Sequence, residues 1–117
     1  MATLITTPIL IDVPGGKLIE EYAGRVASSD ASVSVAMMTA PAGWSEPAQQ
    51  PAFDEVTVVL EGVVVVATEE GEFRVTAGQA IVTRAGERIR YSCPQGARYI
   101  AVCAPAFSPD TVNREEG

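Results

Sequence analysis

The sequence predicts an all-β protein of antiparallel strands, arranged as a sandwich or a barrel. About eight short segments are rich in Val, Ile and Thr, and turn compositions containing Gly or Pro separate them. No helical periodicity lasts for three turns, and only residues 17–22 are compatible with a short helical turn. The expected strands are residues 7–13, 32–39, 55–62, 63–69, 72–76, 79–84, 88–93 and 98–105.

The length and composition indicate one domain, residues 1–117. Its barrel core is expected over residues about 32–107. The strand at 7–13 is apolar on more than one face and would leave an exposed edge, so we expect a homodimer with this strand at the interface. The polar tail, residues 108–117, is expected either to fray or to cover an edge.

The net charge of −7 argues against a nucleic-acid partner, because binding phosphates requires clustered Lys and Arg. No apolar run approaches 18 residues, so no membrane span is expected. The first residues lack the basic start and long apolar stretch of a secretory leader. A cytoplasmic location is therefore the expectation.

Two cysteines, Cys93 and Cys103, are too few for a disulfide framework or a cysteine-built metal site. If residues 94–97, "PQGA", form a hairpin turn, Tyr91 pairs near Ile100 and Cys93 near Arg98. Strand alternation then places Cys103 on the face opposite Cys93. Both cysteines are predicted to be free thiols.

The stretch "GWSEPAQQPAFDEVTVVLEG", residues 43–62, resembles the first motif of the cupins. Gly43 and Gly62 have the separation of the two motif glycines, and Gly78 and Gly86 fit those of the second motif. The segments "FDEVTVVLEG" and "GEFRVTAGQAIVTRAG" are especially similar to ethanolamine-utilisation cupins. The resemblance implies a double-stranded β-helix, a jelly-roll barrel that is often dimeric.

The usual cupin metal ligands are missing, because the chain contains no histidine. On the resemblance, the histidine positions fall on Gln49, Pro51 and Ile89, and the glutamate position falls on Glu55. One carboxylate and one amide cannot hold a catalytic transition metal. A hard cation at Glu46, Asp54 and Glu55 has no supporting loop spacing. We therefore expect no metal or other cofactor, which excludes metal-dependent dioxygenase chemistry.

The motif positions of a cupin point into the barrel mouth, where a small organic ligand would bind. Because side chains alternate along a strand, Thr57 is expected to face the pocket with Glu55. Tyr91 and Cys93 are expected to face it with Ile89 for the same reason. The catalytic candidates are Glu55 and Tyr91, and the substrate-binding candidates are Gln49, Trp44, Glu46, Thr57, Ile89 and Cys93.

Glu55 is the sharpest candidate, because a desolvated carboxyl group has a raised pKa and can act as an acid or base near neutral pH. It could instead be a carboxylate held by the backbone or by Gln49. Tyr91 could donate its phenol to a substrate or simply pack. Trp44 could be a hydrophobic lid or a stacking wall, and Cys93 is expected to be an inert thiol.

These residues favour a metal-independent lyase or isomerase in which Glu55 moves a proton and Tyr91 or Gln49 polarises an oxygen. The alternative is a non-catalytic binding or scaffolding module of a metabolic pathway. The resemblance to ethanolamine-utilisation cupins adds an acetate kinase or an assembly protein. Kinase chemistry has weak support, because no Gly-rich phosphate cradle is followed by a lysine, and Lys17 is the only lysine.

Overall fold

A computed structural model describes residues 1–115, which form nine strands and no helix. The predicted all-β antiparallel architecture is confirmed, and these residues include no helix able to span a membrane. The strands are β1 (Ile9–Ile11), β2 (Leu18–Ala23), β3 (Ser34–Ala40), β4 (Trp44–Ser45), β5 (Asp54–Thr68), β6 (Gly71–Thr76), β7 (Ala80–Thr83), β8 (Ile89–Cys93) and β9 (Ala97–Ala104).

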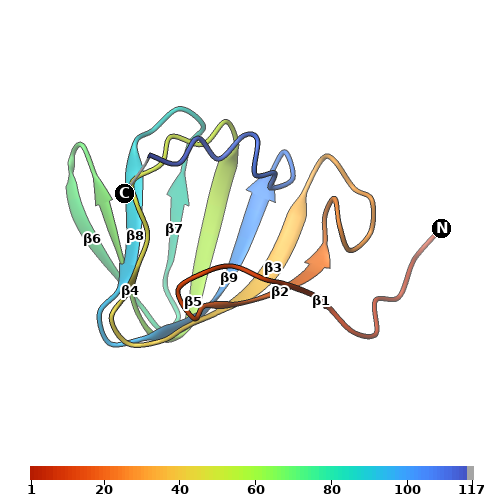
Figure 1. Cartoon of the computed structure of the whole chain (residues 1–117), viewed down its shortest axis with the longest axis horizontal. Helices are drawn as coiled ribbons and strands as arrows, with labels where there is room; N and C mark the ends of the chain where they lie inside the picture. Colours follow the sequence, from red (N-terminus) through yellow and green to blue (C-terminus); the bar gives the residue numbers. More distant parts are fainter. Residues whose placement is uncertain (116–117) are drawn as a thin grey trace.

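Strand β5 joins the two walls of the barrel, and every pairing is antiparallel. Its first half pairs with β7 and β9, and its second half pairs with β6 and β8. The first wall continues from β9 through β3 and β2 to β1, and the second ends at β4. Figure 1 shows the strands curling into an open barrel around this shared strand.

Gly62 allows β5 to bend from one wall into the other. The register of β5 on β9 shifts between Val59 and Glu61, and Gly62 then adopts a φ of +78°. A Cβ atom at Gly62 would lie 2.3 Å from the carbonyl oxygen of Gly96, so only glycine fits this contact. The strands predicted separately at 55–62 and 63–69 are therefore one bent strand.

Two further expectations about local structure were wrong. Residues 17–22 form no helical turn, because Leu18–Ala23 is strand β2, paired with both β1 and β3. The expected hairpin through residues 94–97 does not exist either, since β8 pairs with β4 and β5 while β9 pairs with β3 and β5. These pairings place β8 on the second wall and β9 on the first, and each strand buries one face inside the barrel.

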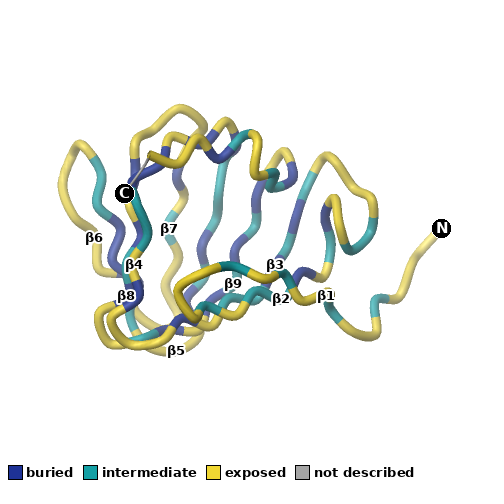
Figure 2. Tube along the Cα trace, viewed as in Figure 1, coloured by how far each residue is buried: buried dark blue, intermediate teal, exposed yellow. Residues whose placement is uncertain are grey.

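The interior of the barrel is apolar. In Figure 2 the buried residues lie mainly along the strands, and the exposed residues lie mainly in the loops between them. One cluster includes Val59, Val64, Val66 and Ile89, and a second contains Phe53, Cys103 and Val112. Both cysteines are buried and free, which confirms the prediction of two free thiols. Val112 shows that the described part of the tail packs into the barrel.

Residues 108–115 lie against the segment that precedes β5. The amide of Ala52 donates a hydrogen bond to the carbonyl of Thr111 at 2.9 Å, and the amide of Glu115 donates to the carbonyl of Ala48 at 2.7 Å. Figure 1 shows this segment running along the rim of the barrel. Of the tail considered in the sequence, residues 116–117 lie outside the described residues.

Candidate functional site

The barrel encloses a cavity of about 460 Å³, large enough for a small metabolite. Its walls come from the β1–β2 hairpin, strands β3, β5, β8 and β9, the β4 segment and the tail. The hairpin lies in front of β5 and β9 in Figure 1. The residues with polar or aromatic side chains that concern the chemistry are Lys17, Trp44, Glu46, Gln49, Glu55, Tyr91, Tyr99 and Arg114.

Glu55 projects from the first half of β5 into this cavity. Its Oε2 accepts a hydrogen bond from the hydroxyl of Thr57 at 3.3 Å, and its Oε1 accepts one from the thiol of Cys103 at 3.7 Å. Burial raises the pKa of Glu55 to about 7, although the nearby charge of Lys17 opposes the shift. The carboxyl group can therefore both release and accept a proton near neutral pH.

Lys17 is a site residue that the sequence reasoning did not select. Its Nζ lies 4.1 Å from the ring centroid of Trp44 and 5.5 Å from that of Tyr99. Burial lowers the pKa of Lys17, while the charges of Glu46 and Glu55 act in the opposite direction. The available signal was its uniqueness, because it is the only lysine in the chain and follows the turn "PGG".

Arg114 connects the tail to two of the predicted binding residues. Its Nη2 lies 3.2 Å from Oε2 of Glu46 and donates a hydrogen bond to Oε1 of Gln49 at 3.0 Å. Burial raises the pKa of Glu46, and the charges of Lys17 and Arg114 oppose that effect. Glu46 is thus already paired with a cation, whereas Glu55 has only the weaker hydroxyl and thiol donors.

Tyr91 lines the cavity from β8, and its hydroxyl lies 3.3 Å from the hydroxyl of Thr83. Burial, then the charge of Glu55, raises the pKa of this phenol above its ordinary value, so it stays protonated and able to donate. Five of the eight predicted site residues line the cavity: Trp44, Glu46, Gln49, Glu55 and Tyr91.

The other three predicted site residues, Thr57, Ile89 and Cys93, are buried outside the cavity lining. Thr57 reaches the site through its hydrogen bond to Glu55. Burial raises the pKa of the Cys93 thiol to about 11, which keeps it protonated at neutral pH.

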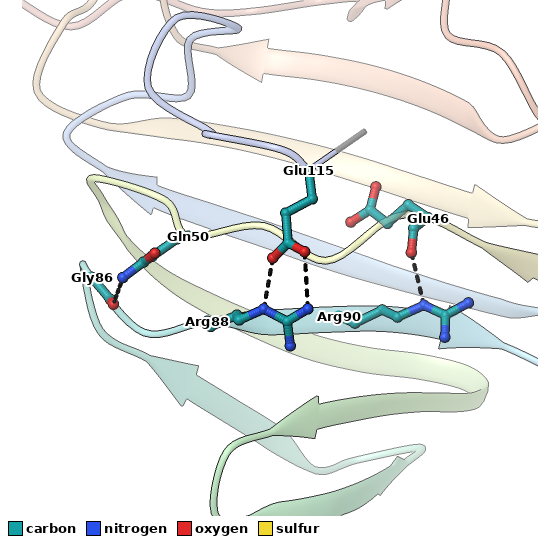
Figure 3. Close-up of polar contacts among 6 residues, drawn as sticks. All are labelled: Glu46, Gln50, Gly86, Arg88, Arg90 and Glu115. Atoms are coloured by element: carbon teal, nitrogen blue, oxygen red, sulfur yellow. Dashed lines mark hydrogen bonds and ion pairs between the residues drawn. The ribbon is translucent and has the colours of Figure 1, made fainter. Parts of the chain in front are cut away.

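Contacts outside the cavity hold the segments that carry its polar groups. Arg88 donates two hydrogen bonds to the carboxylate of Glu115, at 2.6 and 2.9 Å, which tie the tail to the residue just before β8 (Figure 3). In the same view Arg90 donates to the backbone carbonyl of Glu46 at 3.0 Å. These contacts hold in place the two backbone segments that carry Glu46 and Arg114.

The donor set at the cupin metal positions does not fit a transition metal. Pro51 and Ile89 offer no side-chain donor, and the carbonyl oxygen of Gln49 already accepts from Arg114. Glu55 is then the remaining ligand, whereas such metals require several imidazole, thiolate or carboxylate groups. Within residues 1–115 no three His, Cys, Asp or Glu side chains gather in a way that could hold a metal ion.

A curled antiparallel barrel with a ligand-sized cavity between its walls defines a protein of the cupin type. The model of the ethanolamine utilisation protein EutQ matches residues 29–108, and the chain belongs to this family. The predicted cupin fold and the similarity to ethanolamine-utilisation cupins are thereby confirmed.

Solved structures agree on the fold. A cupin of the RmlC type from Shewanella frigidimarina superposes with a TM-score of 0.77 at 16% identity, covering 93% of this chain and 94% of that one. An ethanolamine utilisation protein Q from Salmonella typhimurium gives 0.63 at 22% identity, covering 78% and 71%. Streptomyces PAC13, in a structure with uridine, gives 0.77 at 16% identity, covering 97% and 88%.

A curated protein of Myxococcus xanthus, described as endoribonuclease YbeY, is 46% identical over 108 residues. The match covers 91% of this chain but 37% of that protein, so the chain corresponds to about a third of it. The name of the longer protein therefore assigns no activity to this chain.

Proposed function

We propose that this protein is a metal-independent cupin that binds a small organic metabolite in its cavity and catalyses acid–base chemistry of the lyase or isomerase type. The observation that carries the proposal is Glu55, whose pKa is raised to about 7 within a mostly apolar cavity. A cytoplasmic location is part of the proposal, because two free thiols suit a reducing compartment.

The proposed reaction uses Glu55 as a carrier of one proton. As a carboxylate it removes a proton from a carbon of the ligand, and as a carboxylic acid it returns a proton. Return to a different carbon isomerises the ligand, and transfer to a departing hydroxyl group releases water. The Tyr91 phenol lines the same cavity and supplies a hydrogen bond donor for a developing oxyanion.

A non-catalytic binding or scaffolding module is the alternative. Membership of the ethanolamine utilisation family supports this alternative, since a protein of a metabolic pathway can bind a metabolite without converting it. In that case Glu55 would only complete the polar lining of a ligand site, and the ligand would leave chemically unchanged.

Proton exchange tests the proposal without knowledge of the substrate. The protein is incubated with a metabolite extract of its host in D2O, and mass spectrometry identifies compounds that gain deuterium or change mass only in its presence. Glu55→Gln should lower this turnover by about 100-fold or more, since it removes the proton carrier but keeps a similar shape. Thermal melting verifies that the variant is folded.

The neighbouring carboxylate provides a matched control. Asp54 is half exposed on the same strand, where it accepts from the amide of Ala85 at 2.9 Å and pairs with Arg84 at 3.6 Å. Asp54→Asn should retain full turnover. Equal turnover in Glu55→Gln would sink the acid–base role, and a ligand that binds without exchange or conversion would favour the binding module.

A further inference from the structure

Lys17 lines the cavity as a half-buried amine that has no carboxylate partner in a salt bridge among the residues that the structure describes. Within residues 1–115 Lys17 forms no salt bridge, although Glu46 and Glu55 line the same cavity. Its Nζ lies over the rings of Trp44 and Tyr99. Structural pairing therefore does not account for its position among the residues that line the cavity.

The surroundings of Lys17 also favour the uncharged form of its amine. Desolvation lowers the pKa of Lys17, which increases the fraction of uncharged amine at neutral pH. The uncharged form is the nucleophile, and lysines activated in this way form imines with carbonyl compounds. The charges of Glu46 and Glu55, which line the same cavity, limit the shift.

We propose that Lys17 forms an imine with a cavity ligand that carries an aldehyde or ketone group, and that Glu55 moves the protons of this step. The inference rests on the proposed acid–base role of Glu55 and adds the substrate class. Glu46 is the weaker candidate for the proton carrier, because Arg114 pairs with it at 3.2 Å.

The step balances without an oxidant or a reductant. The nitrogen lone pair of Lys17 attacks the carbonyl carbon, a carbon–nitrogen bond forms, and the carbonyl electron pair moves to oxygen. That oxygen takes a proton from Glu55, and the nitrogen then returns one to the carboxylate. A second proton from Glu55 lets the hydroxyl group leave as water, which gives an imine from one amine and one carbonyl compound.

The surroundings of Lys17 suit the product of this step. A protonated imine is a cation, and the ring faces of Trp44 and Tyr99 next to Nζ would stabilise it. It would also draw electrons from the adjacent carbon, which makes a proton there easier for Glu55 to remove. This links the covalent step to the proton transfer proposed above.

Reductive trapping tests the imine directly, with benzaldehyde and cyanoborohydride as the probe at neutral pH. Because Lys17 is the only lysine, the N-terminal amine is the only other primary amine and serves as an internal reference. Peptide mass mapping should find one benzyl group on Lys17, added at least about tenfold faster than at the N-terminus. Glu55→Gln should slow the Lys17 reaction by about tenfold or more.

Lys17→Arg is the matched variant, because it keeps the positive charge over Trp44 but has no nucleophilic amine. It should show no adduct at position 17 and should still bind carbonyl compounds without reacting. Labelling only at the N-terminus, or at equal rates on both amines of the wild type, would overturn the imine. The wild-type measurement needs no variant, so poor folding of Lys17→Arg leaves the test intact.

The two proposals fail in different ways. If trapping fails while deuterium exchange still depends on Glu55, the imine is wrong and the acid–base function stands. If Lys17 is trapped at a rate that Glu55→Gln does not change, the lysine is a nucleophile but Glu55 is not its proton carrier. If neither trapping nor exchange occurs, both proposals are overturned.

Discussion

Glu55 lies where burial and charge act in opposite directions on one proton. Burial raises its pKa from 4.5 to about 7, and Lys17 and the hydrogen bond from Thr57 oppose this rise. In the unfolded chain the carboxyl releases its proton near pH 4.5, whereas in the folded protein it holds the proton up to about pH 7. The folded state therefore binds more protons than the unfolded state between these values.

This difference predicts that stability falls as pH rises from about 4.5 to about 7. The loss contributed by Glu55 is about 3 kcal/mol when complete. Glu55→Gln should match the wild type at acidic pH and exceed its free energy of unfolding by that amount well above pH 7. Urea unfolding at several pH values measures this, with exposed Glu61→Gln on the same strand as the control for losing one charge. A gap that stays constant with pH would contradict the raised pKa.

The sequence reasoning found Glu55 but not Lys17, and the cause is distance along the chain. Glu55 stands within a motif whose spacing can be read locally. Lys17 reaches the cavity only because the β1–β2 hairpin folds across the barrel, bringing it to Trp44. Arg114 is also distant in sequence from the motif, and the tail brings it to Gln49 and Glu46.

At the scale of elements, β5 depends on the contact between Gly62 and Gly96. Gly62→Ala should destabilise the protein by about 3 kcal/mol or more, because a Cβ would lie 2.3 Å from a backbone oxygen that cannot move independently. Gly78→Ala is a close control, with a φ of +85° against +78° but nothing within 4 Å of the added Cβ. It should cost about 1 kcal/mol from backbone strain alone. Similar urea midpoints for the two variants would refute the steric account.

The sequence correctly predicted where β8 and β9 lie along the chain, but it did not predict which strands they pair with. Alternation in β8 and β9 correctly indicated strands, with buried Tyr91 and Cys93 in one and buried Tyr99 and Cys103 in the other. A short turn between them indicated a hairpin, yet each strand pairs with a different part of β5. Sequence periodicity shows which residues share a face and does not show which strand covers it.

At the scale of the whole molecule, the outer face of the larger wall is unusually apolar. The strand registers place Val35, Val102, Val56 and Val82 in one row across four strands. Met37, Ile100, Val58 and Ala80 form the next row. All eight residues keep accessible surface, and across these four strands neither row contains a charged side chain, while Glu20 of β2 lies beside Met37 at the edge of the second row. A continuous apolar surface of this kind is typical of a protein interface.

We propose that a second copy of this chain covers these two rows in a two-fold dimer, because an apolar face is complementary to itself. This interface lies on β3, β5, β7 and β9 and not on the strand at 7–13 that the sequence suggested. Light scattering should then give twice the chain mass of 12.3 kDa. Ile100→Glu, in the middle of the face, should produce monomers, since a buried unpaired charge would be strongly unfavourable. Phe73→Glu is the control, because Phe73 is half exposed on β6 of the other wall, and it should leave the dimer intact. A wild-type mass of one chain, or an unchanged dimer in Ile100→Glu, would exclude this interface.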